Sequence, residues 1–108
     1  MIGITKPLTV NGFTNLGALL RAAGFVGDKL RMLLIDNPST TVPVYVHFTA
    51  SNLSAGLTGT DGIPLSAGAF PARRNLELVA GAQDFPELNH IWLYTASSIP
   101  ITVAAIGN

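Results

Sequence analysis

The fold is decided by residues 30–49, which read LRMLLIDNPSTTVPVYVHFT. Two apolar runs flank a polar segment, and the second run alternates Val42, Val44, Val46 and Phe48 with Pro, Tyr, His and Thr. Alternation with a period of two places these four side chains on one face of a strand. Asp, Asn and Pro favour a turn between the runs, because Asp and Asn bond local backbone groups and Pro fixes φ. The pattern predicts a β-hairpin at the centre of the fold.

The last part of the chain, LNHIWLYTASSIPITVAAI (residues 88–106), has a similar pattern. Its two alternating runs flank the small, polar residues 96–98, which predicts a second hairpin. Shorter apolar runs lie at residues 63–65 and 75–80. About seven short strands between Gly, Pro, Asn and Ser turns are typical of an all-β (mainly β) domain. We expect one domain over residues 1–108, built as an antiparallel β-sandwich or a jelly-roll-like small barrel.

The N-terminal region predicts one short helix. Leu16, Leu19, Leu20 and Ala23 follow the i, i+3, i+4, i+7 spacing of a helix face, so we expect a helix over residues 15–23. Thr14 is the expected N-cap, and Gly24 is expected to end the helix in the left-handed conformation. Before it, residues 2–10 predict a short strand, interrupted or at an edge because Pro lacks an amide donor, or residues 1–12 form an extended arm on a neighbouring subunit.

The composition favours permanent contact with other protein. Charged residues make up 11% of the chain, against about 25% in an ordinary soluble domain. The net charge is zero, hydrophobic residues make up 48%, and there is no cysteine. A surface with few ionic groups is easier to desolvate, and zero net charge promotes association. We therefore expect a homo-oligomer or a component of an assembly.

The same composition argues against several classes of partner and site. A nucleic-acid interface needs a basic patch, and the only local pair of cations is Arg73-Arg74. No apolar run reaches the roughly 18 residues needed to cross a bilayer, and the N-terminal residues do not resemble a signal peptide. The lack of cysteine excludes disulfides and thiolate zinc sites. We expect neither nucleic acid nor membrane as a partner.

No residue pattern predicts catalysis or a bound metal. The two histidines, His47 and His90, have no metal-ligand spacing, so we expect half-exposed strand histidines bonded to neighbours. A small hydrolase or lyase on a cupin-like barrel would need both rings in one pocket. No serine lies in a G-x-S-x-G motif, and no glycine-rich phosphate loop is present. We expect a non-enzymatic protein without catalytic residues, metal or cofactor.

Aromatic residues are the best candidates for contacts with a partner. Trp92 and Tyr94 alternate onto one strand face, and Tyr45 could lie close to them. Such rings either stack on a sugar or pack at a protein contact, and we favour the protein contact because Trp is enriched at interfaces. The residues expected at a partner contact are Tyr45, His47, Arg73, Arg74, Trp92 and Tyr94.

Three segments carry a resemblance to a known class of proteins. They are LLIDNPSTTVPVYVHF, TDGIPLSAGAFPARRNLELVAG and LNHIWLYTASSIPITVAAIG, which together span most of residues 30–106. Their order of turns and strands resembles small structural proteins of tailed bacteriophages, including capsid decoration or cement proteins and head-fibre modules with a β-sandwich fold. The predicted helix at residues 15–23 is not part of this resemblance.

The resemblance implies a virion protein that is made in the host cytoplasm and has no enzymatic activity. Its expected partner is the major capsid protein or another virion protein, and its expected role is to decorate and stabilise the capsid across contacts between capsid subunits. The alternative is a carbohydrate- or receptor-binding module of a phage fibre or tail. Trp92, Tyr94, Tyr45 and the Ser/Thr/Asn-rich residues 50–61 motivate that alternative.

Overall fold

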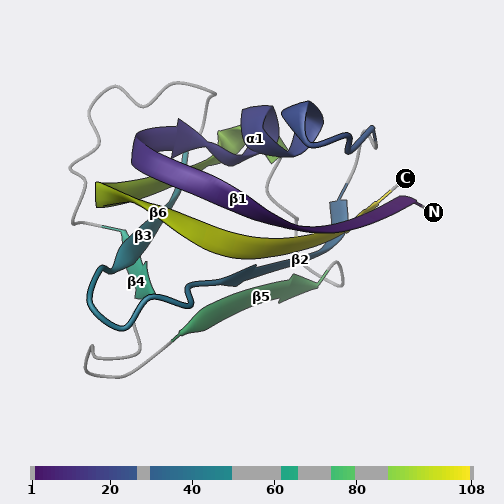
Figure 1. Cartoon of the computed structure of the whole chain (residues 1–108). Helices are drawn as coiled ribbons and strands as arrows, with labels where there is room; N and C mark the ends of the chain where they lie inside the picture. The colour runs from purple at the N-terminus through teal and green to yellow at the C-terminus, as the bar shows by residue number, and fades with distance from the viewer. Residues whose placement is uncertain (1, 27–29, 50–61, 66–73, 80–87, 108) are drawn as a thin grey trace.

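A computed structural model of the chain describes residues 2–26, 30–49, 62–65, 74–79 and 88–107. These residues form a mainly β structure with one short α-helix, α1 (Leu16–Ala22), and a 3₁₀ helix, η2 (Leu88–His90) (Figure 1). The strands are β1 (Ile2–Asn15), β2 (Leu30–Asp36), β3 (Val44–Phe48), β4 (Ile63–Leu65), β5 (Asn75–Val79) and β6 (Ile91–Gly107). The expected all-β class is confirmed. The strands form one antiparallel sheet that is nearly closed into a barrel.

Strand β6 is the centre of this sheet. Along one edge it pairs with β1, from Ile2 opposite Gly107 to Asn15 opposite Trp92. Along its other edge it pairs first with β3 and then with β2. β4 extends the sheet beyond β3, and β5 extends it beyond β2. The N-terminal half of β6 therefore lies on the side of β3 and β4, and the C-terminal half of β6 lies on the side of β2 and β5. We name the two halves of the sheet after these two halves of β6.

The two predicted hairpins are wrong. β2 and β3 do not pair with each other, because each pairs with its own half of β6. Residues 96–98 are not a turn either, because β6 continues through them. Between Val10 and Gly12, β1 advances by two residues while β6 advances by four, from Ile99 to Thr95. The small residues 96–98 therefore form a bulge, and β1 and β6 turn together at this point (Figure 1).

This turn folds the sheet over its own core. The two extra residues leave the alternation of β6 in phase, so the same face stays inside on both sides of the bulge. Gly12 has φ of +61° opposite the bulge, a conformation that glycine adopts at little cost. The enclosed side chains from both halves belong to one hydrophobic cluster, which includes Val44, Val46, Leu65, Ile91, Leu93, Leu33, Ile35, Leu76, Ile101 and Val103.

The helix α1 covers this core from the side of β1. Its Leu16 and Leu20 are fully buried, and Leu19 is half-buried, as the spacing predicts. The N-cap is Asn15 instead of Thr14: its side chain accepts a hydrogen bond from the amide of Ala18 at 3.1 Å. The β1 strand runs up to this cap, so the strand interpretation holds for residues 2–10 and the extended arm does not. Within the described residues, β1 pairs only with β6 and is therefore an edge strand, where a proline is tolerated.

The C-terminal end of α1 has the predicted glycine. Gly24 has φ of +105°, and its amide donates to the carbonyl of Arg21 while the amide of Phe25 donates to the carbonyl of Leu20. This pair of bonds is the Schellman motif. Phe25 is buried, so the motif also places an aromatic ring in the core. The ammonium group of Lys6 on β1 donates to the carbonyl of Ala23 at 2.8 Å and holds this end of the helix to the sheet.

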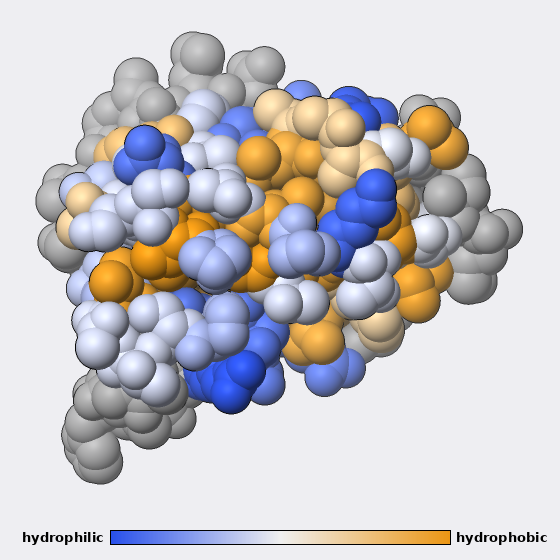
Figure 2. All heavy atoms as spheres, in the orientation of Figure 1, coloured by the Kyte–Doolittle hydropathy of each residue, from blue (hydrophilic) through white to orange (hydrophobic). Residues whose placement is uncertain are grey.

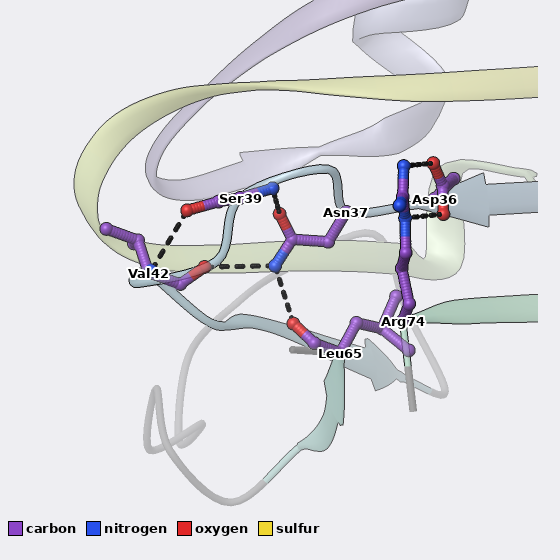
Figure 3. Close-up of polar contacts among 6 residues, drawn as sticks. All are labelled: Asp36, Asn37, Ser39, Val42, Leu65 and Arg74. Atoms are coloured by element: carbon purple, nitrogen blue, oxygen red, sulfur yellow. Dashed lines mark hydrogen bonds and ion pairs between the residues drawn. The ribbon is translucent and has the colours of Figure 1, made fainter. Parts of the chain in front are cut away.

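One buried amide holds the two halves of the sheet together where β2 and β3 separate. Asn37 follows β2 and is fully buried. Its Nδ2 donates to the carbonyls of Val42 and Leu65, and its Oδ1 accepts from the amide of Ser39 (Figure 3). Its own amide donates to the carbonyl of Arg74, next to β5. The segment that sequence reasoning assigned to a hairpin turn is thus a link to β4 and β5.

None of the helices in the described part of the chain is long and apolar enough to cross a membrane.

Candidate partner-binding surface

Aromatic side chains form a row across three strands on the outer face of the N-terminal half. The register places Tyr94 of β6 opposite Tyr45 of β3 on one side and Phe13 of β1 on the other. The ring centroids of Phe13 and Tyr94 are 4.8 Å apart, and those of Tyr45 and Tyr94 are 6.4 Å apart. All three residues are half-buried, so each keeps part of its ring accessible. We call Phe13, Tyr94 and Tyr45 the aromatic row.

A second row lies beside it on the same face, with Trp92 of β6 between His47 of β3 and Asn15 of β1. Trp92 is half-buried, and its Nε1 is a buried donor for which the described residues provide no acceptor. A buried donor without an acceptor costs about 1–3 kcal/mol, so this group is unusual in a folded chain.

His47 lies on the predicted face, but it is buried instead of half-exposed. Its ring lies 5.6 Å from the ring of Phe13, between centroids. On its other side, Gly62 lies so close that a Cβ there would be 2.9 Å from Nε2 of His47. The His47 ring therefore packs against Phe13 from the neighbouring row and offers almost no contact area of its own.

Arg74, the described residue of the predicted basic pair, does not join this surface. Arg74 lies beside the other half of the sheet, where its guanidinium donates to both carboxylate oxygens of Asp36 at 2.9 and 3.1 Å (Figure 3). The Arg74 side chain is half-exposed, so this ion pair contributes little to stability. Arg73 lies outside the described residues, as do residues 50–61, which were expected to include a contact region rich in Ser, Thr and Asn.

A second outward surface, which sequence reasoning missed, lies on the C-terminal half. The register places Met32 opposite Ile106 and Leu34 opposite Ala104, with all four side chains on the outer face and half-buried. We call these four residues the β2–β6 patch. Figure 2 shows hydrophobic and weakly hydrophilic atoms over much of one face of the molecule, with strongly hydrophilic groups confined to a few places. The uninterrupted apolar run at residues 32–35 was the available signal, because it marks a strand with two apolar faces.

The described residues hold no group of three or more His, Cys, Asp or Glu side chains that could bind a metal. His90 ends η2, where its carbonyl accepts hydrogen bonds from the amide and hydroxyl of Thr49. His47 and His90 both have partners of their own.

Comparison with known proteins adds no family: no family model matches the chain, and no curated protein or solved structure matches it significantly.

Proposed function

We propose that this chain is a non-enzymatic structural protein of a tailed-bacteriophage particle, where it decorates and stabilises the capsid by binding across contacts between major capsid proteins. One observation carries the proposal. The central strand β6 contains no charged residue over its 17 residues, although about half of its side chains lie on the outer face of the sheet. Antiparallel sheets that face water on one side normally carry polar side chains there.

The β2–β6 patch is the proposed surface of attachment. It consists of Met32, Leu34, Ala104 and Ile106, which lie side by side on two paired strands. Burying apolar area contributes roughly 25 cal/mol per Å², and association entropy offsets part of this gain at each contact. A symmetric particle repeats the same contact many times, so even a modest contact stabilises the whole shell. The resemblance of the three sequence segments to small structural proteins of tailed bacteriophages supports the same assignment.

The proposal is tested on purified particles of the phage that encodes the chain. Quantitative mass spectrometry of separated heads and tails is expected to find the protein on heads, in many copies per particle. Its absence from particles, or its presence on tails alone, would contradict the assignment to the capsid. Native mass spectrometry of the isolated chain tests the accompanying proposal that it forms a homo-oligomer.

A further inference from the structure

We propose that the aromatic row is a binding site for a neutral saccharide, separate from the β2–β6 patch. The three rings of Phe13, Tyr94 and Tyr45 follow one another across β1, β6 and β3 on the outside of the sheet. The flat, weakly polar C–H face of a sugar ring packs well on an aromatic face. The site lies on the other half of the sheet from the proposed capsid contact, so it does not depend on that contact.

The size of the row favours a small ligand over a protein. Each aromatic side chain has a surface of about 150–250 Å², and a half-buried ring exposes a minor part of that surface. The three rings of the row therefore expose roughly 200 Å² in total. A stable protein interface needs about 800 Å² on each partner. The most exposed large hydrophobic residues of the described ranges, Val26 and Phe48, lie outside the row and do not extend it.

The charge and hydrogen-bonding groups of this face favour a neutral, hydroxyl-rich ligand. The described residues of the two rows are Phe13, Asn15, Tyr45, His47, Trp92 and Tyr94, and they include no Asp, Glu, Lys or Arg. No hydrogen bond within the described part of the chain uses the hydroxyl of Tyr45 or Tyr94. These two hydroxyls are therefore free to donate to, or accept from, saccharide hydroxyls beside the stacked ring.

The rings are also held in place before any ligand arrives. Phe13 contacts both Tyr94 and the buried ring of His47, with interplanar angles of 49° and 57°. Tyr94 in turn contacts Tyr45 at 43°. Side chains that are already ordered lose little conformational entropy on binding, which favours affinity.

The chain contains its own reporter for this site. Trp92 is the only tryptophan, and it lies in the neighbouring row on the same face, two residues before Tyr94. Titration of the full chain with malto-, cello-, chito- and galacto-oligosaccharides is followed by Trp92 fluorescence. At least one class is expected to give a saturable change with a Kd of about 1 mM, the affinity of a small ligand on a shallow face.

Variants separate stacking from general packing. Tyr94→Ala and Tyr45→Ala are each expected to weaken binding at least about tenfold, whereas Tyr94→Phe keeps the ring and stays within about threefold. Phe48→Ala removes an exposed ring outside the row and should leave the affinity unchanged. Circular dichroism tests whether each variant is folded. If Tyr94→Ala is unfolded, Tyr45→Ala at the end of the row provides the test. No fluorescence response to any saccharide at about 20 mM, or wild-type affinity in both alanine variants, would overturn the proposal.

Discussion

The buried side chain of Asn37 donates a hydrogen bond to the carbonyl oxygen of Leu65 at 2.6 Å, which joins the end of β2 to the end of β4. The same Nδ2 also donates to Val42, and the backbone amide of Asn37 donates to Arg74 beside β5. One residue thus satisfies backbone groups from both halves of the sheet at the point where β2 and β3 part. A buried polar group is stabilising only when its bonds are complete, and here both side-chain donors and the acceptor are used.

Replacing this amide is expected to be costly. Asn37→Ala leaves the carbonyls of Val42 and Leu65 and the amide of Ser39 without their partner, so the free energy of unfolding should fall by about 3 kcal/mol. Asn37→Asp keeps the shape but loses both donors, and it should be at least as destabilising at neutral pH. Urea denaturation measures the change. Thr40→Ala, at an exposed position of the same segment, is the control and should change stability by less than about 0.5 kcal/mol. Equal stability of Asn37→Ala and the control would refute the role given to Asn37.

The bulge in β6 has a polar contact of its own. Thr95 is buried, and its hydroxyl lies 2.6 Å from the carbonyl of Ser97 and 3.2 Å from that of Val10. Thr95→Val preserves the shape and removes the donor, so we expect a loss of about 1.5 kcal/mol in urea denaturation. Thr102→Val in the same strand replaces an exposed threonine and should have little effect. If both variants unfold at the same urea concentration, the hydroxyl does not hold the bulge.

Close packing at Gly62 gives a steric prediction. A Cβ there would lie 2.6 Å from the carbonyl oxygen of Val46, so Gly62→Ala must displace β3 or β4. We expect a loss of about 2 kcal/mol, as for other overpacked sites. At Gly3 the nearest atom to a new Cβ is 3.7 Å away, so Gly3→Ala should change stability by no more than about 0.5 kcal/mol. Thermal unfolding compares the two, and a tolerated alanine at position 62 would contradict the packing described around His47.

Local features were predictable from the sequence because local chemistry determines them. The spacing of Leu16 and Leu20 and the glycine at position 24 place the helix and its end correctly. The alternation identifies the buried face correctly along β6 and at Val44 and Val46 of β3, whereas Phe48 at the end of β3 is exposed and His47 is buried. Each of these features depends on residues within a few positions of one another.

Pairing partners were not predictable, because they depend on contacts far apart in the sequence. β1 pairs with β6 across a wide separation in sequence, from Ile2 opposite Gly107 to Asn15 opposite Trp92, and no local signal marks that choice. The small residues 96–98 suit a hairpin turn and a bulge equally well. The segment after Asp36 has turn chemistry, but that chemistry serves the buried Asn37 and its long-range bonds.

The candidate surface was predictable only in part, because it too depends on which strands pair. Tyr45, His47, Trp92 and Tyr94 share a face because β3 and β6 pair in the register that places them opposite one another. Phe13 was missed because the first strand was expected to end at Val10, whereas β1 continues to Asn15. The aromatic residue at position 13, of a type enriched in strands, was the available signal that the strand continues beyond Val10.

The central claim is that the chain attaches to a phage capsid through the β2–β6 patch. The most direct measurement is the number of copies per purified particle after complementation with wild-type chain, Ala104→Glu or Ala18→Glu. Ala104 lies in the patch and Ala18 on the exposed side of α1, so the two variants carry the same change at different surfaces. A buried, unpaired carboxylate is costly at an interface. We expect Ala104→Glu, shown to be folded by circular dichroism, to be reduced at least about tenfold on particles, while Ala18→Glu matches wild type. Equal copy numbers for all three chains, or none on the particles, would contradict it.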